Sequence, residues 1–361
     1  MYGQGLYGRT MDAAQIHGDQ DTMHAMLSSM TPKDRARCYA WGPDGRKRTP
    51  LKVEQLDALA AIVATSKNKV AKLMHAGPNT RAVFKAEMHA MALVRSAFGE
   101  NLENCTTLRS LFLPSPIKGR QPMEVAGIET PSGFYIMSGK CDTPLDKFKF
   151  TQKNVAGFVR DILFGFSTLH AGNVLHCDVK LDNMIYCASE RRFKLIDWGA
   201  SDTMPAVRKR YMDVERPKNT SSPFAWFAWG LGAAASVVYM SFHALKYAGD
   251  MVGCSDYRSL ILSARDSFES AYDKLVEANK TKNKKGNGKM DEEALRRHVL
   301  DRYVRSFDLF SFGFILAHIA CSGDKELTTG MRQRLLKLAR RLTHYDDPDF
   351  TQDAADALKH F

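Results

Sequence analysis

Short apolar runs dominate the chain from Leu51 to about Met137, and their length and composition predict β-strands. The runs are rich in aliphatic and aromatic residues, and polar or turn-forming residues separate them. The sequence TPSG, for example, is typical of a tight turn between two paired strands. The predicted strands are 60–66, 69–74, 123–129 and 133–138.

One segment of this region has a helical period instead. In residues 81–98, apolar side chains recur three or four positions apart, which places them on one face of a single helix. That face consists of Phe84, Met88, Met91 and either Val94 or Ala92.

The chain after Cys141 is predominantly helical by the same criterion. Residues 154–172 form an amphipathic pattern that Gly172 is expected to end. Residues 183–197 predict two short strands around a polar turn, and most of the remainder has helical periodicity. The pattern therefore predicts an α+β protein. The apolar face of the first helix consists of Val155, Phe158, Ile162, Phe166 and Leu169.

Composition is consistent with a folded protein of 361 residues, with 44% hydrophobic and 25% charged residues. This length suggests one large bilobed unit or two domains. The net charge of +11 favours acidic or phosphate-bearing partners. No module that interleaves aromatic and basic residues is present, so nucleic-acid binding is not expected to be the main activity.

The seven cysteines are scattered and form no C-x-x-C pair, which indicates neither a zinc site nor a disulfide framework. Their use fits a reducing, intracellular compartment, either cytoplasm or nucleus. The first 20 residues lack the apolar core of a secretory signal.

An uncharged stretch from Asn219 to Leu245 is about long enough to cross a bilayer. His243 and the small residues in its middle favour a buried helix over membrane contact by residues 224–245. The lysine-rich segment 279–293 is expected to be a solvated loop.

The polar run LHCDVKLDNMI, residues 175–185, combines residue types that phosphoryl transfer requires. Such a site must orient a hydroxyl nucleophile, neutralise a triphosphate and hold Mg²⁺, and carboxylates, a carboxamide and a lysine do this. The run resembles the catalytic loop H-R-D-x-K-x-x-N of eukaryotic-type protein kinases. Fourteen residues after Asn183, the sequence Asp197-Trp198-Gly199 resembles the D-F-G motif of that family.

The resemblance implies a role for each residue. Asp178 would accept or orient the proton of the substrate hydroxyl, and Lys180 would balance charge on the γ-phosphate. Asn183 and Asp197 would bind Mg²⁺, and His176 would be structural. The implied cofactors are ATP and Mg²⁺, and the implied substrates are Ser and Thr side chains of proteins.

Cys177 stands where the family has an arginine. In kinases that are switched by phosphorylation of the activation segment, that arginine pairs with the new phosphate. The resemblance therefore implies an enzyme that is not switched in this way. The thiol itself is expected to be a small apolar filler.

Further matches extend the resemblance over residues 51–361. The segment 306–320 resembles the D-x-W-S-x-G helix, in which Asp308 would brace the backbone of the catalytic loop. Residues 133–148 resemble the strand-to-hinge connection, which puts Met137 at the gatekeeper position and Ser138 to Lys140 along the adenine edge. The expected fold is two-lobed, with a small β-rich lobe and a larger helical one. The expected domains are an extension at 1–50, an N-lobe at 51–139, and a C-lobe at 140–361 with an insert at about 224–304.

In this family, a lysine on the third strand holds the α- and β-phosphates, and a glutamate on the following helix holds that lysine. Two alignments of this sequence could supply the pair. In the first, Lys72 lies on the third strand and pairs with Glu87 on the following helix, and Met91 faces the core. In the second, Lys85 pairs with Glu103, but Thr107 then occupies the apolar position. The first register is favoured.

Two departures from the family pattern stand out. No glycine occurs between Gly45 and Gly77, where a G-x-G-x-x-G loop was sought, and side chains there would weaken the phosphate cradle. Phe224 replaces a glutamate that normally anchors the end of the activation segment. These departures suggest a divergent kinase, and we take a large DNA virus as a working guess for its origin.

Two other functions share part of this pattern. A pseudokinase scaffold would keep the fold without turnover. Small-molecule kinases of the aminoglycoside and choline type also have an H-x-D-x-x-x-x-N loop followed by I-D-W, which this chain contains. Lys180, Gly199 and Asp308 favour a protein substrate over a small one.

Overall fold

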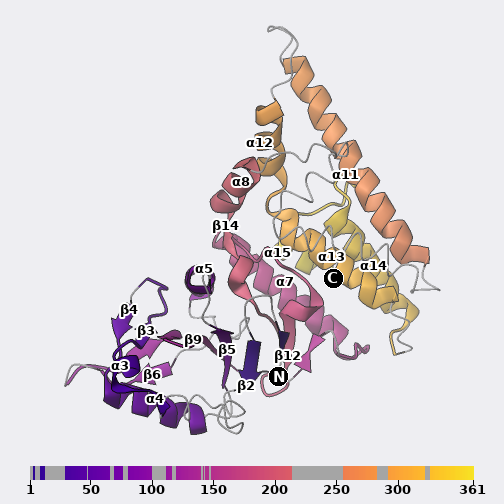
Figure 1. Ribbon diagram of the computed structural model, residues 1–361. Helices are drawn as coiled ribbons and strands as arrows, with labels where there is room; N and C mark the ends of the chain where they lie inside the picture. Colours follow the sequence, from indigo (N-terminus) through magenta and orange to yellow (C-terminus); the bar gives the residue numbers. More distant parts are fainter. Residues whose placement is uncertain are drawn as a thin grey trace. The chain divides into compact units, whose positions relative to one another are not determined.

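The computed structural model divides into two compact units, which are described separately (Figure 1). Unit 1 comprises Met1–Pro144 and Ile185–Gly199, and unit 2 comprises Leu145–Met184 and Ala200–Phe361. The residues that the structure describes are 3–4, 9–12, 29–46, 48–65, 69–75, 80–99, 111–115, 119–139, 141, 143–145, 148–213, 255–282, 292–321 and 326–361.

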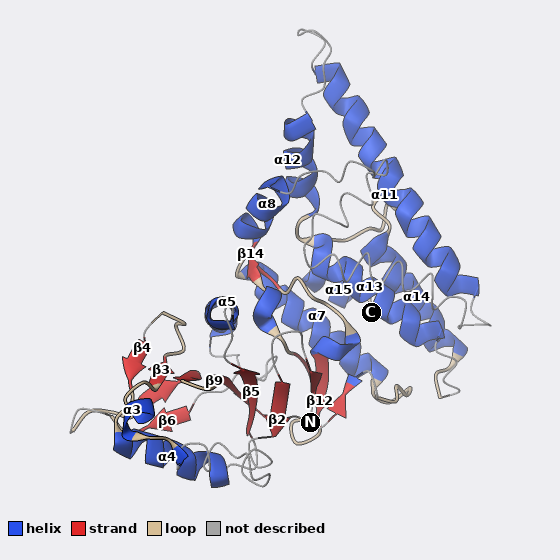
Figure 2. Cartoon of the chain, viewed as in Figure 1, coloured by secondary structure: helices blue, strands red, loops and turns tan. Residues whose placement is uncertain are grey.

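Unit 1 is built on a seven-stranded sheet in the order β1-β2-β5-β9-β8-β3-β4 (strands in red in Figure 2). Every neighbouring pair is antiparallel. The strands are β1 (Gly3–Gln4), β2 (Arg9–Asp12), β3 (Tyr39–Trp41), β4 (Arg48–Pro50), β5 (Lys69–His75), β8 (Gly127–Thr130) and β9 (Gly133–Gly139).

Residues 1–50 were expected to be an extension, yet they supply four of these strands. Strands β1 and β2 form one edge of the sheet beside β5, and β3 and β4 form the other edge beside β8. The segment between β2 and β5 therefore reaches from one edge of the sheet to the other.

The predicted strands 69–74 and 133–138 are confirmed as β5 and β9, which pair along their whole length. The predicted strand 123–129 divides at Ala126, whose N–H donates to the carbonyl of Trp41 at 2.9 Å. On one side of this break, β7 (Met123–Val125) pairs with β6 (Leu111–Leu113). On the other side, β8 pairs with β9.

The predicted strand 60–66 is wrong, because this segment ends helix α4 (Val53–Thr65). Leu56, Leu59 and Ala60 are buried on one side of that helix, three and four positions apart. A run of small and aliphatic residues suits a buried helix as well as a strand, so composition alone did not separate the two.

The predicted helix 81–98 is confirmed as α5 (Thr80–Phe98), and its expected apolar face is buried. The ring of Phe84 stacks on Phe134 of β9 at 4.8 Å between centroids. Gly127 of β8 lets the helix approach closely, since a Cβ there would lie 2.8 Å from the sulfur of Met88. Helix α5 is therefore packed against the middle of the sheet.

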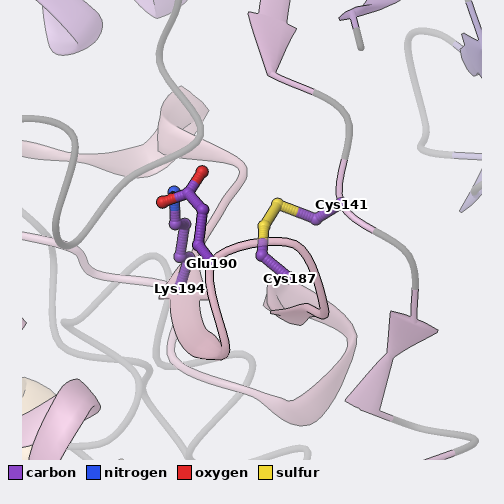
Figure 3. The surroundings of a disulfide bond; sticks show 4 residues. All are labelled: Cys141, Cys187, Glu190 and Lys194. Carbon is purple, nitrogen blue, oxygen red and sulfur yellow. Dashed lines mark hydrogen bonds and ion pairs between the residues drawn. A yellow bond between two sulfur atoms is a disulfide. The ribbon is translucent and has the colours of Figure 1, made fainter. Parts of the chain in front are cut away.

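A small sheet in unit 1 joins β10 (Thr143–Pro144), β12 (Met184–Cys187) and β13 (Arg192–Leu195). Beside it, Cys141 and Cys187 form a disulfide whose Cα atoms are 4.4 Å apart (Figure 3). The cysteine spacing had indicated no disulfide framework, and it gave no sign of this bridge. Its partners are 46 positions apart, so no local motif marked them.

Unit 2 is predominantly helical (blue in Figure 2). The predicted helix 154–172 is confirmed as α7, which ends at Ala171 with Gly172 at its C-cap. The two-stranded ladder of β11 (Val174–Leu175) and β14 (Asp202–Thr203) follows. The remaining helices are α8 (Met204–Asp213), α11 (Ser255–Lys282), α12 (Glu292–Tyr303), α13 (Ser306–Cys321), α14 (Thr329–Thr343) and α15 (Ala354–Lys359).

Helix α13 is the core of unit 2, and its side chains are buried on nearly every side. Phe312 contacts Phe158 and Phe166 of α7, with ring centroids 5.6 and 5.8 Å apart. These aromatic contacts bind the predicted apolar face of α7 to α13.

Helix α11, in the insert expected at about 224–304, packs within unit 2 and contacts residues that follow α14. Ser263 bonds to Nε2 of His344 at 2.8 Å, and Ser267 donates to the Asp346 carboxylate. Phe268 lies edge-on to Tyr345 with centroids 5.3 Å apart. Part of the insert is therefore a packed component of the unit.

No single helix among the described residues is both long enough and apolar enough to cross a membrane. The segments Arg297–Tyr303 and Ser306–Cys321, bent by 59°, meet these two criteria only as a pair. The second of them is the buried helix α13. The uncharged stretch 219–245 lies outside the described residues.

We expect Gly313→Ala to destabilise the protein by about 1–3 kcal/mol. A Cβ at Gly313 would lie 2.5 Å from Cγ2 of Thr343 on α14 and 3.1 Å from the carbonyl of Ala339. Adding Thr343→Ser should restore part of the loss, because it removes Cγ2 and keeps the hydroxyl. Urea unfolding measures both effects.

The matched control is Gly330→Ala, also in a helix but with no atom within 4 Å of the new Cβ. This change should leave stability equal or raise it by up to about 1 kcal/mol. Equal losses at the two glycines would show that α13 and α14 do not pack this closely.

Candidate active site

The polar run 175–185 is an irregular segment of unit 2 between two strands. It leaves β11 at Leu175 and continues through the 3-10 turn Leu181–Asn183 into β12. His176 is fully buried at its start, and its carbonyl accepts a hydrogen bond from Ser201 Oγ at 3.1 Å. The loop is thus held at both ends by regular structure.

Three residues of this loop meet at one carboxylate oxygen. Lys180 Nζ lies 2.8 Å from Oδ2 of Asp178, and Asn183 Nδ2 donates to the same oxygen at 2.7 Å. Asn183 Nδ2 also donates to the Asp178 carbonyl at 2.8 Å. The other carboxylate oxygen, Oδ1, accepts no hydrogen bond from the residues that the structure describes. The Asp178 side chain is 22% exposed, so solvent and solutes can reach it.

Asp308 of α13 holds the start of the loop, as its motif had predicted. Its Oδ2 accepts the N–H of His176 at 2.8 Å, and its Oδ1 accepts the N–H of Cys177 at 2.9 Å. A ring nitrogen of His170, on α7, lies 3.1 Å from Oδ2. One side chain therefore fixes the backbone of the two residues that precede Asp178.

The Asp308 carboxylate is buried, with 1% of the residue exposed. Burial alone would raise its pKa. The hydrogen bond and positive charge of His170, with the backbone N–H of His176, outweigh burial and lower the pKa below the usual value of 3.8. The carboxylate is ionised at neutral pH, which suits an acceptor of several N–H groups.

Cys177 has a left-handed backbone, with φ of +62°. A residue with a Cβ rarely adopts this conformation, which costs on the order of 1 kcal/mol. The hydrogen bond from its N–H to Asp308 accompanies this turn and orients Asp178 after it. The thiol is free.

The Asp197-Trp198-Gly199 motif lies in unit 1, directly after β13. Asp197 also has a left-handed backbone, with φ of +62°. A Cβ placed on Gly199 would lie 3.6 Å from Oδ1 of Asp197 and 3.6 Å from Oε2 of Glu87. The carboxylates of Asp197 and Glu87 therefore both approach this glycine, although α5 and β13 are far apart in the sequence.

Glu87 lies on α5 and is 4% exposed. Lys72 lies on β5, which is third in the sheet order and pairs with β9 opposite Ile136. Lys85 is an exposed residue of helix α5, so the second register, which placed it on a strand, is wrong. Its partner in that register, Glu103, lies outside the described residues.

The structure describes some, but not all, of the residues expected along the adenine edge. Met137 and Ser138 lie on β9, and their backbones pair with Ala71 and Val70 of β5. Lys140 lies outside the described residues.

A glycine motif was missed at the start of the chain. Gly3, Gly5 and Gly8 spell G-x-G-x-x-G; Gly3 lies on β1, and residues 5–8 lie outside the described residues. Strand β2 pairs with β5, where Thr10 lies opposite Lys72. The motif is visible in the sequence, but the expected extension at 1–50 excluded it, and the glycine loop was expected between Gly45 and Gly77. The absence of a glycine loop from that interval therefore says nothing about the phosphate cradle.

The donor set at the two expected metal ligands fits Mg²⁺. Asn183 uses Nδ2 for both of its side-chain hydrogen bonds, which leaves its carbonyl oxygen for a cation. Asp197 supplies carboxylate oxygens. The two residues lie in different units, so their pairing stays a prediction. No cluster of three His, Cys, Asp or Glu residues suited to a metal occurs among the described residues.

Comparison with known proteins points to one family. Residues 134–222 match the family model described as the protein kinase domain. Serine/threonine-protein kinase PLK4 of Drosophila yakuba is 27% identical over 121 residues, 34% of this chain and 14% of that protein. The same kinase of Drosophila virilis is 25% identical over 162 residues, 44% of this chain and 18% of that protein. The chain spans less than a fifth of these relatives. The family match includes the catalytic loop and Asp197, whereas Lys72 and the glycine motif precede it.

We expect Asp308→Asn to lower the free energy of unfolding by about 3–5 kcal/mol at pH 7, since it removes the charged acceptor from a buried network. The folded-state pKa of Asp308 lies below its unfolded value of 3.8. Its contribution is therefore complete above the unfolded pKa and is lost as the pH falls through the folded-state pKa.

The difference between wild type and Asp308→Asn should stay constant from pH 7 to pH 5 and shrink below about pH 3.8. Urea unfolding at several pH values measures it. Asp266→Asn, at an exposed position on α11, is the control and should change stability by less than about 0.5 kcal/mol. A difference that grows on acidification would show that Asp308 is not stabilised as its ionised form.

Proposed function

We propose that this chain, which belongs to the eukaryotic-type protein kinases, transfers the γ-phosphoryl group of ATP to serine and threonine hydroxyls of other proteins. The observation that carries the proposal is the convergence of Lys180 and Asn183 on one oxygen of Asp178. A lysine, a carboxamide and a carboxylate in contact are the groups that this reaction needs.

In this proposal Asp178 orients the substrate hydroxyl through Oδ1 and accepts its proton as the oxygen attacks phosphorus. Oδ2 is engaged by Lys180 and Asn183, which fixes the plane of the carboxylate. Lys180 is 36% exposed, so its ammonium can also approach the transferring phosphoryl group and offset its charge.

Mg²⁺, when bound, would neutralise the phosphate oxygens, with Asn183 and Asp197 as its protein ligands. Lys72 would hold the α- and β-phosphates, and Glu87 would position Lys72. The burial of Glu87 and its approach to Gly199 support this assignment.

The proposed phosphate cradle is the glycine motif at residues 3–8, of which only 3–4 are among the described residues. Glycine at three positions lets the chain approach the phosphates closely, and hydrogen bonds from successive N–H groups would bind them. The pairing of β2 with the strand of Lys72 supports a common phosphate-binding role.

The same residues favour a protein kinase over the two rival functions. Lys180 in contact with the base is the choice of Ser/Thr protein kinases, and Asp308 braces the loop as it does in that family. A pseudokinase scaffold has no need for a base with a free carboxylate oxygen. A small-molecule kinase is also less consistent with the protein kinases that this chain resembles.

We further propose that phosphorylation of the activation segment does not switch this enzyme. The arginine that would receive the phosphate is replaced by Cys177, whose side chain carries no positive charge. The backbone of Cys177 is held by Asp308, which needs no phosphate to do so.

Asp178→Asn should reduce phosphoryl transfer to a generic basic protein by at least about 100-fold, because an amide cannot accept the proton. Mg²⁺-dependent stabilisation by ATP should remain, and a thermal shift measures it separately from turnover.

Asp182→Asn is the matched control, an exposed aspartate in the same loop whose loss should leave turnover unchanged. Nucleotide binding without turnover in the wild type would favour the scaffold. Normal turnover in Asp178→Asn or in Asp197→Ala would overturn the assignment.

Gly5→Val should raise the KM for ATP about tenfold or more and leave the melting temperature of the nucleotide-free protein unchanged. The new side chain would keep the backbone away from the phosphates. Initial rates at varied ATP concentration measure the effect. An unchanged KM would mean that residues 3–8 do not cover the nucleotide.

A further inference from the structure

A basic pocket lies in unit 2 between one face of α14 and the end of the chain. Its cavity volume is about 370 Å³. Its basic groups, Arg334, Lys337 and Arg341, occur at helical spacing on α14, so they project from the same face. The opposite wall consists of His360 and Phe361. None of these residues belongs to the proposed active site.

Arg341 is the unusual member of the group. Its side chain is only 14% exposed, yet its guanidinium makes no hydrogen bond to any residue that the structure describes. The two nearest carboxylates, Asp349 and Asp356, lie at 4.0 and 3.8 Å, beyond hydrogen-bond length. Its Nε is fully enclosed and has no acceptor. A buried guanidinium normally satisfies its five donors. The two terminal nitrogens of Arg341 have only ion pairs longer than a hydrogen bond, so they can still donate to a ligand in the pocket.

The two outer cations of the pocket are not neutralised. Arg334 and Lys337 form no ion pair or hydrogen bond with the described residues. By contrast, Arg340 on the next face of the same helix is paired with Asp347 at 2.8 Å. Asp356 faces the pocket region from α15, but it already approaches both His360 and Arg341. The pocket therefore retains excess positive charge.

The size and lining of the pocket indicate which class of ligand it can bind. A volume of about 370 Å³ is at the lower end for small-molecule sites, which suits one anionic group with a short stem. Leu338 and Phe361 add apolar surface beside the cations. Planar guanidinium groups bind phosphate through paired N–H donors, which a tetrahedral dianion accepts well.

We propose that this pocket is a binding site for a phosphate monoester. Arg341 forms the base of the site and donates to two phosphate oxygens, while Lys337 and Arg334 supply charge at its mouth. The ester can be a phosphoserine or phosphothreonine side chain, and its stem then contacts Leu338 and Phe361. Free phosphate has the same head group without the stem, so the two sources can be separated by experiment.

The test uses the full chain without nucleotide, so that no transfer occurs. Three probes are compared by isothermal titration calorimetry at about 0.15 M salt: a neutral peptide with one phosphothreonine, the same peptide with threonine, and inorganic phosphate. We expect the phosphopeptide to bind and the threonine peptide not to bind.

The decisive variant is Arg334→Gln combined with Lys337→Gln. Both residues are exposed, so the protein should fold, and binding of the phosphopeptide should weaken by about tenfold or more. Arg341→Gln should abolish binding, although its burial makes loss of stability a second effect. The matched control is Arg340→Gln, which removes the same charge from the neighbouring position outside the pocket and should weaken binding less than about twofold.

Each outcome bears on the proposal. If inorganic phosphate alone binds and the double variant abolishes this, the site is supported and free phosphate is its source. Equal affinity for both peptides, equal losses in Arg340→Gln and the double variant, or no binding of any probe would overturn it. Stabilisation by Mg²⁺ and ATP should be unchanged in the double variant, so a failure here is distinguishable from a failure of the proposed kinase activity.

Discussion

The loop at 175–185 depends on the hydrogen bonds that the Asp308 carboxylate accepts from its backbone. A charged group inside the protein is costly unless hydrogen bonds replace its water, and here two backbone N–H groups and His170 do so. The same bonds stabilise the left-handed backbone of Cys177, a conformation that this residue would rarely adopt in an isolated chain. The position of Asp178 therefore follows from a residue of α13 that is 130 positions further along the chain.

Helix α13 can hold the loop in place because nearly all of its own side chains are buried against other parts of unit 2. Aromatic contacts with α7 fix one side of it, and the close approach of α14 at Gly313 fixes another. A polar loop held by a packed helix is a common way to keep reacting groups in place while leaving them accessible. Helix α14 then has one side in the core and another that carries unpaired cations, which separates its structural role from the proposed phosphate site.

In unit 1 the sheet brings together residues that the sequence separates widely. Strand β2 begins more than 60 positions before Lys72, yet β2 and β5 are hydrogen-bonded neighbours. Between them in the sequence, β3 and β4 complete the opposite edge of the sheet. This long separation explains why no glycine motif stands immediately before Lys72. Glu87 and Asp197 approach Gly199 from α5 and β13 in the same unit.

Features whose physical cause is local could be predicted from the residues alone. Periodicity predicted helices α5 and α7 and strands β5 and β9, and a short motif identified the loop at 175–185. In each case, residues within a few positions of one another carry the signal. Other features depend on distant partners and became visible in the folded chain. They are the helix at 53–65, the sheet strands at 3–4 and 9–12, the Cys141–Cys187 bridge and the Arg341 Nε without an acceptor among the described residues. Each depends on which surface the chain meets after folding, and no local pattern carries that information.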